Sequence, residues 1–312
     1  MYLKTHFEND FHAASQLPPS CSLTANFLLY YIYYDTNRIL KGVISVTWND
    51  REICKIAEHR LFIDCSSASL GHYLELAFGP FRERVADYTD AADMNIRIDE
   101  GFGVPFSGYE VAVSQSNDGV VFARADYRIT ADTAYYNVRI EAFDGFSLKH
   151  ALLQLYSAFI TNREWGLLVH SSCVLKGERA YLFAGPSGAG KSTVVRHSYP
   201  RPILSDEASI VKIESGRVVA FNSPFRSDIH ASSGSEAHPL AGIQFLRQAP
   251  RNRRLLMRSS DGLLKLLTTV FHWAHSPAEN AKALRLCKRM VGLVPVYDFH
   301  FVQNESFWEE VM

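Results

Sequence analysis

The chain has 312 residues, of which 47% are apolar and 21% are charged, and its formal net charge at pH 7 is −1. This balance is typical of folded chains and excludes collagen, a coiled coil and wholesale disorder. Because the charge has no basic excess, nucleic-acid binding would need a local patch. The longest apolar run, residues 27–34, is too short to span a bilayer, so we expect no membrane partner.

The cysteines and the N-terminal residues indicate a cellular compartment. Five cysteines, widely spaced and without a C-x-x-C pair, argue against a disulfide framework or a zinc ribbon. We expect buried free thiols in a reducing compartment. The first residues include histidines and acids and lack a basic region followed by an apolar core, so no secretory signal is expected. These features predict a cytoplasmic protein.

The first half, residues 1–145, is dense in aromatic residues and is predicted to be a β-rich domain that recognises an acceptor or has a structural role. A hairpin turn is predicted at Asn117-Asp118-Gly119. A helix is predicted at residues 68–78, where Gly79 and Pro80 end it. The predicted strands of this half are residues 28–34, 39–47, 95–98, 109–113, 120–125 and 135–142.

The second half, residues 146–312, is predicted to be an α/β domain that opens with an amphipathic helix at residues 147–162, capped by Ser147. Residues 223–239 are polar and rich in serine and glycine, which predicts a loop. The remaining predicted elements are hairpins of residues 167–175 with 180–184 and 203–213 with 218–221, a strand at 242–246, helices at 262–273 (capped by Ser260 or Asp261) and 277–290, a strand at 293–302 and a short helix at 305–311.

Residues 185–192 fit the pattern G-x-x-x-x-G-K-[ST] at every constrained position. Its glycines let successive backbone N–H groups point into one hole, and the following helix adds its positive end, which suits a polyphosphate. Lys191 can bridge the outer phosphates, and the hydroxyl of Ser192 suits Mg²⁺. An apolar run precedes the loop, as a strand should. The predicted ATP-binding residues are Gly185, Pro186, Ser187, Gly188, Ala189, Gly190, Lys191, Ser192 and Thr193.

Two adjacent acids, Asp206 and Glu207, begin 15 residues after Lys191. Beside a bound triphosphate, one carboxylate can hold Mg²⁺ and the other can take a proton from an attacking hydroxyl. Apolar residues on both sides favour a buried strand end over an exposed turn. The chain lacks the Asn-Lys-x-Asp motif of GTPases, and transport or helicase ATPases place their metal-binding acid farther along. We therefore expect Mg²⁺ ligands among Ser192, Asp206 and Glu207.

The ordered set of these motifs resembles the catalytic domain of bacterial HPr kinase/phosphorylase and its diverged relatives, the HPr-kinase-like serine kinases, over about residues 166–302. The resemblance is carried by the glycine-rich pattern at residues 185–193, which is a P-loop. It is also carried by residues 168–172, 204–207, 222–225, 239–241 and 294–297. It implies an α/β (α+β) domain with a mixed sheet, akin to the nucleotide domain of ATP-dependent phosphoenolpyruvate carboxykinase. It also implies that Asp206 activates the acceptor hydroxyl, that Glu207 is a second acid and that His170 is a site residue.

Other residues leave two interpretations open. His170 is either a site residue or a satisfied core histidine, and Arg226 and Arg247 are either phosphate or substrate contacts or surface arginines. The basic stretch at residues 247–258 has no interleaved aromatics, so we expect a solvated face or the rim of an anionic-substrate site, and no nucleic-acid partner. His272 and His275 lack a third ligand and are expected at a helix end.

The sequence thus predicts an ATP- and Mg²⁺-dependent kinase that transfers the γ-phosphate to a hydroxyl, either a serine of a peptide or protein or a small-molecule alcohol. The general base would be Asp206. Two alternatives remain open: a non-catalytic module in which ATP orders residues 223–239 to control a partner, and an ATPase without a phosphorylated acceptor. The second signature of HPr kinase is not matched at residues 221–228, so HPr as acceptor and reversal by phosphate are not implied. HPr kinases are ring assemblies, so the resemblance allows a homo-oligomer.

Overall fold

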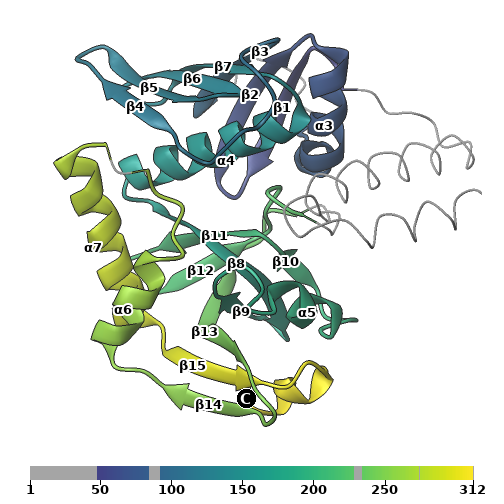
Figure 1. Ribbon diagram of the computed structural model, residues 1–312, viewed down its shortest axis with the longest axis vertical. Helices are drawn as coiled ribbons and strands as arrows, with labels where there is room; N and C mark the ends of the chain where they lie inside the picture. Colours follow the sequence, from purple (N-terminus) through teal and green to yellow (C-terminus); the bar gives the residue numbers. More distant parts are fainter. Residues whose placement is uncertain (1–47, 84–91, 228–233, 274, 312) are drawn as a thin grey trace, which may run out of the picture. The chain divides into compact units, whose positions relative to one another are not determined.

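The computed structural model describes residues 48–83, 92–227, 234–273 and 275–311. Every described residue belongs to one compact unit of the chain (Figure 1). Cys21 and the strands predicted at residues 28–34 and 39–47 lie outside the described ranges.

The first sheet has seven strands in the order β1-β2-β3-β7-β6-β5-β4. Its β2–β3 and β3–β7 pairs are parallel and its other pairs are antiparallel. Side chains alternate between buried and less buried along β2, β5 and β6, as expected for a sheet with one face on the core. The predicted β-rich character of this region is confirmed. The strands are β1 (Arg51–Ile56), β2 (His59–Cys65), β3 (Met94–Glu100), β4 (Ala112–Gln115), β5 (Gly119–Arg124), β6 (Tyr127–Asp132) and β7 (Asn137–Ala142).

Two predicted strands of this sheet begin later than expected. The strand predicted at residues 109–113 begins only at Ala112, and the turn at Asn117-Asp118-Gly119 leads into β5 as predicted. The strand predicted at residues 135–142 begins at Asn137, because Tyr135 has a left-handed backbone with φ of 57°. The Asp132 carboxylate accepts the N–H groups of Ala134, Tyr136 and Asn137 and so closes a turn there.

The helix predicted at residues 68–78 is confirmed as α3 (Ala68–Phe78), and a short 3₁₀ turn, η1 (Gly79–Phe81), follows it. The helix predicted at residues 147–162 is α4 (Gly145–Asn162). Its N-cap is Asp144, so the prediction of Ser147 as the cap is wrong. The two side chains form a capping box, in which each accepts the other's backbone N–H at 2.8 Å.

The second sheet has eight strands and mixes parallel and antiparallel pairs. Its strand order is β10-β8-β11-β12-β13-β15-β14, and β9 pairs with both β8 and β13. The described residues are therefore an α/β arrangement of two sheets with few helices. The strands are β8 (Gly166–Lys176), β9 (Arg179–Ala184), β10 (Ile203–Ser205), β11 (Ala208–Ile213), β12 (Val218–Phe221), β13 (His238–Gln248), β14 (Arg253–Leu256) and β15 (Val296–Phe301).

Several predicted bounds in this half need correction. The strand predicted at residues 203–213 is interrupted at Asp206 and Glu207, which separate β10 from β11. The basic stretch 247–258 contains β14, which pairs with β15. Of the loop predicted at 223–239, residues 228–233 lie outside the described ranges, and His238 already belongs to β13.

The helices of this half also differ from the prediction at their ends. The helix predicted at residues 262–273 is α6 (Ser259–Leu267), and its N-cap is Arg258 rather than Ser260 or Asp261. The next helix, α7 (Pro277–Leu293), extends beyond residue 290 and shortens the strand predicted at 293–302 to β15. The final helix is the 3₁₀ turn η2 (Glu305–Glu309), and α5 (Lys191–Arg196) follows the glycine-rich loop.

The four described cysteines are buried and form no disulfide, as the sequence predicted. Burial raises the pKa of the Cys54, Cys173 and Cys287 thiols to about 12. Among the described residues, no helix is both long and apolar enough to cross a membrane.

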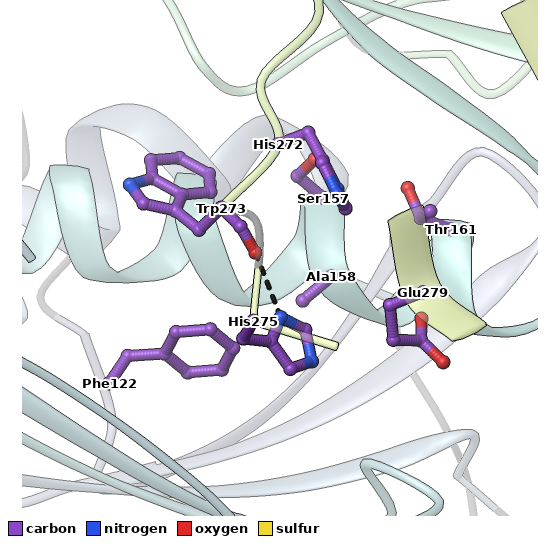
Figure 2. Close-up of a pocket in the computed structure, with 8 residues that line it drawn as sticks. All are labelled: Phe122, Ser157, Ala158, Thr161, His272, Trp273, His275 and Glu279. Atoms are coloured by element: carbon purple, nitrogen blue, oxygen red, sulfur yellow. Dashed lines mark hydrogen bonds between the residues drawn. The ribbon is translucent and has the colours of Figure 1, made fainter. Parts of the chain in front are cut away.

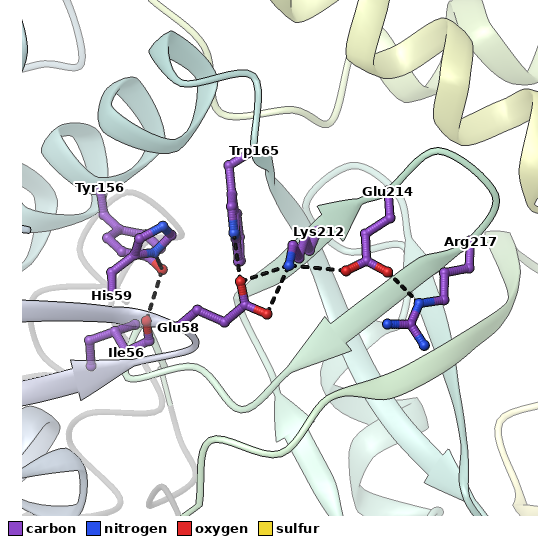
Figure 3. A network of polar contacts seen from close by, with 8 residues as sticks. All are labelled: Ile56, Glu58, His59, Tyr156, Trp165, Lys212, Glu214 and Arg217. Atoms are coloured by element: carbon purple, nitrogen blue, oxygen red, sulfur yellow. Dashed lines mark hydrogen bonds and ion pairs between the residues drawn. The ribbon is translucent and has the colours of Figure 1, made fainter.

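A polar network joins the turn between β1 and β2 to β11 (Figure 3). The Glu58 carboxylate accepts hydrogen bonds from Lys212 Nζ at 2.7 and 2.8 Å and from Trp165 Nε1 at 3.0 Å. The next residue, His59, is enclosed by the rings of Tyr156, Phe159 and Trp165. The first sheet, α4 and the second sheet are thus held together by both charge and ring packing.

The enclosed histidine predicts a loss of stability in acid. Burial lowers the pKa of His59 to about 4, whereas an unfolded imidazole titrates near 6.5. Because protonation favours the unfolded chain, the contribution of His59 is complete above about pH 6.5 and is lost as pH falls toward 4. We predict that His59 contributes a slope of up to about 1.4 kcal/mol per pH unit to the free energy of unfolding, measured by urea titration.

His59→Gln should lower this slope, because its side chain takes up no proton on unfolding. Burial also lowers the pKa of His150 to about 4, so a slope from His150 should remain in His59→Gln and should fall in the double variant His59→Gln/His150→Gln. A slope in His59→Gln equal to that of wild type would contradict the assignment to His59.

Candidate functional site

The glycine-rich loop connects β9 to α5, so the strand before it and the helix after it are confirmed. Gly188 and Gly190 have left-handed backbones with φ of 78° and 111°. A Cβ on Gly190 would lie 2.4 Å from the ring of Phe301, so only glycine fits at this point. The glycine spacing therefore has both a conformational and a packing cause.

The loop is also held by side chains from its surroundings. Lys191 Nζ donates to the carbonyl oxygens of Gly185 at 2.8 Å and Pro186 at 3.1 Å. Burial lowers the pKa of Lys191, and the charge of Glu207 acts against this shift. Gln248 at the end of β13 donates from Nε2 to the Gly188 carbonyl at 2.9 Å. Ser192 is exposed at the start of α5.

The glycine-rich loop and the two acids lie on opposite edges of one short segment of β8, formed by His170 and Ser171. On one edge, Ser171 pairs with Ala184, the residue before the loop. On the other edge, His170 pairs with Ala208, and the Ser171 N–H donates to the Glu207 carbonyl at 3.1 Å. The predicted acid pair is therefore separated from the strand that precedes the loop by β8 alone.

Asp206 is buried, Glu207 is half-buried, and the two acids share one neighbour, Ser227. Asp206 is 7% exposed, and its Oδ1 accepts the Ser227 N–H at 3.1 Å. The Ser227 hydroxyl donates to Glu207 Oε2 at 2.8 Å, and Lys149 from α4 forms an ion pair with the same oxygen. Burial raises the pKa of Glu207, but the interactions with Lys149 and Ser227 outweigh it and hold the pKa below its ordinary value. Glu207 is therefore an ionised carboxylate with a dedicated counter-ion.

His170 lies in this site with one ring nitrogen unsatisfied. Its Nδ1 is buried and has no hydrogen-bond partner among the described residues. Its ring stands edge-on to Phe271 at 5.4 Å between centroids. Burial lowers the pKa of His170 and the charge of Lys191 lowers it further, while Glu207 raises it. A neutral imidazole with an open nitrogen is suited to a polar ligand.

The two arginines predicted as phosphate or substrate contacts differ in their surroundings. Arg226 donates at 2.8–2.9 Å to the carbonyls of Ser223, Ile203 and Leu204, and so binds the backbone that leads to Asp206. The side chain of Arg247 is 61% exposed and lies 3.9 Å from Asp298. A contact of either arginine with phosphate stays a prediction.

A small pocket elsewhere is lined by α4, α7, Phe122 and the segment that holds His272 and His275 (Figure 2). Both histidines follow α6 rather than end it, so the predicted helix end is corrected. His272 Nε2 lies 2.9 Å from Asn280 Oδ1, and His275 Nδ1 lies 2.8 Å from the Trp273 carbonyl. No group of three His, Cys, Asp or Glu side chains in the described ranges is placed to hold a metal.

Sequence reasoning missed two residues of this site, Lys149 and Ser227. Lys149 carries a signal, because it precedes the apolar Leu153 and Tyr156 by four and seven residues and so shares their helix face. The sequence around Ser227 contains no such signal, since the contacts of Ser227 depend on the path of the chain after β12. No protein-family model and no curated protein matches this chain.

The fit of Gly190 against Phe301 predicts a cost for any side chain there. Gly190→Ala should lower the free energy of unfolding by about 1–3 kcal/mol, because the left-handed backbone and the ring both oppose a methyl group. Gly216→Ala is the matched control: a Cβ there meets nothing within 4 Å, and the change should stay within about 0.5 kcal/mol. Urea unfolding of both variants checks this, and an equal effect would show that the loop tolerates a side chain.

Proposed function

We propose that the chain is an ATP- and Mg²⁺-dependent kinase that transfers the γ-phosphate to a hydroxyl group. The observation that carries this proposal is the position of β8, which places the glycine-rich loop and the two acids beside His170. We further propose that residues 146–312 are a kinase domain of the HPr-kinase-like type. The mixed sheet supports this finer assignment, as does the resemblance of residues 166–302 to that family.

The residues present fit Mg²⁺-ATP. The backbone of Gly188 and Gly190 is bent as a phosphate-binding loop requires, and the Lys191 ammonium is already within the loop. When phosphate oxygens are present, they would replace the loop carbonyls as acceptors for Lys191. Asp206 would serve as the base, and Ser192 would hold Mg²⁺, which neutralises charge on the phosphates. Glu207 is less suited to this role, because Lys149 already compensates its charge.

The transfer step needs a base for the acceptor hydroxyl. In the proposed step the acceptor oxygen forms a bond to the γ-phosphorus, the bond from that phosphorus to the β–γ bridging oxygen breaks, and ADP leaves. Asp206 takes the hydroxyl proton, since it is a buried carboxylate at the edge of β8 opposite the strand that leads into the loop, and its Oδ1 accepts the Ser227 N–H. The open Nδ1 of His170 would hydrogen bond the acceptor or a phosphate oxygen.

The acceptor is proposed to be a serine of a peptide or protein, or a small-molecule alcohol. The β-rich region before α4 would help to recognise it. Four buried, unbridged cysteines support a cytoplasmic location. A homo-oligomer is compatible with the proposal.

The test is transfer of labelled γ-phosphate from Mg²⁺-ATP to a cytoplasmic extract separated into peptide and small-molecule fractions. Wild type should label one fraction. Asp206→Asn should lower the rate by about 10²–10⁴ while ATP affinity changes by less than about threefold, because only the base is lost. Lys191→Ala should lose ATP binding as well. Asp261→Asn, on the exposed start of α6, is the matched control and should keep full activity.

Three outcomes would contradict the proposal. ATP binding without label or phosphate release would indicate a regulatory module, and phosphate release without a labelled acceptor would indicate an ATPase. Full activity of Asp206→Asn would remove Asp206 from the role of base.

A further inference from the structure

One charged residue of the site comes from outside residues 166–302. Lys149 lies in the second turn of α4 and is 8% exposed. Its ammonium forms an ion pair with Glu207 Oε2, and its side chain is 10% exposed against 18% for Glu207. The ion pair joins the helix that packs on the first sheet to the acid segment of the second, with Lys149 buried and Glu207 half-buried.

Glu207 is surrounded by groups from several elements, and within the described ranges two side chains, Lys149 and Ser227, contact its carboxylate. Lys191 acts on it only at longer range, since its ammonium is bound to the loop carbonyls. The side chains that hold Glu207 by contact are Lys149 and Ser227. The titratable groups that share its surroundings are Tyr73 of α3, Lys149 and His150 of α4, His170 of β8 and Lys191 of α5.

Ser227 connects this ion pair to the proposed base. Its hydroxyl donates to Glu207 Oε2 at 2.8 Å, and its N–H donates to Asp206 Oδ1 at 3.1 Å. A continuous chain of contacts therefore runs from Lys149 through Glu207 and Ser227 to Asp206. None of these contacts involves a residue of the glycine-rich loop.

We propose that Lys149 is a positioning residue of the kinase site, which fixes Asp206 by holding Glu207 and, through it, Ser227. This inference rests on the proposed function. A buried ion pair is costly to desolvate, and apolar residues of similar size often stabilise a fold as well or better. Stability alone therefore does not account for the ion pair between Lys149 and Glu207. Its role is to hold the two acids in position. Because the chain of contacts bypasses the loop, Lys149 should govern the transfer step and not ATP affinity.

The test compares Lys149→Met, Lys149→Arg, Glu207→Gln and the double variant Lys149→Met/Glu207→Gln. We expect Lys149→Met to lower kcat by about tenfold or more with KM for ATP changed less than about threefold. Lys149→Arg should recover most of kcat, since it keeps the cation. The double variant should be no slower than Glu207→Gln alone, because both changes break the same chain of contacts.

A thermal melt gives a second, activity-independent readout. Lys149→Met should lower Tm by at least about 5 °C, because it leaves Glu207 without its cation, and the double variant should recover most of that loss. Lys212→Met is the matched control: this lysine also joins the two sheets, through Glu58, but has no contact with the site in the described residues. It should lower Tm without changing kcat.

The possible failures are distinguishable. Wild type that neither binds ATP nor transfers phosphate would overturn the proposed function and this inference together. An active wild type with Lys149→Met at full kcat would overturn the role of Lys149 alone. The role of Lys149 would also be overturned if the kcat losses of the two single variants multiplied in the double variant. The same holds if kcat of Lys149→Arg were no higher than that of Lys149→Met. If Lys149→Met does not fold, kcat and KM for ATP of Lys149→Arg and of the double variant are compared with those of wild type and Glu207→Gln instead.

Discussion

The pairing of β8 with several strands at once is the constraint on which the candidate site depends. This strand pairs with β9 on one edge, with β11 on the other, and with β10 toward its end. Because β9 leads into the glycine-rich loop and β10 and β11 flank the two acids, one strand sets the distance between that loop and a pair of carboxylates. His170 and Ser171 lie at the point where the two edges meet.

The helix α4 extends this arrangement to the first sheet. It contacts β6 and β7 on one side and β8 on the other, and most of its residues are buried. Such a helix has almost no free surface, so a lysine on it must find a buried acceptor. Glu207 fills that need, and the site therefore includes a residue that motif comparison alone would leave out.

Local signals in the sequence predicted much of the fold and part of the site. The glycine spacing predicted the loop after β9, and the apolar residues at helical spacing predicted α4. The Asn-Asp-Gly sequence predicted the β4–β5 hairpin. The turn between β1 and β2 was missed, because Ala57 adopts its left-handed backbone, with φ of 53°, without a glycine to signal it. Lys149 and Ser227 were missed because each depends on contacts between segments far apart in the chain.

The central claim is that a nucleotide's phosphates occupy the loop after β9, and hydrogen exchange with and without Mg²⁺-ATP tests it most directly. The account predicts slower exchange of the backbone amides at residues 186–193 and of the acid segment that β8 holds beside them. It also predicts that Lys191→Ala abolishes this protection. Unchanged exchange at the loop, or protection confined to another region such as the pocket around His272 and His275, would contradict the account.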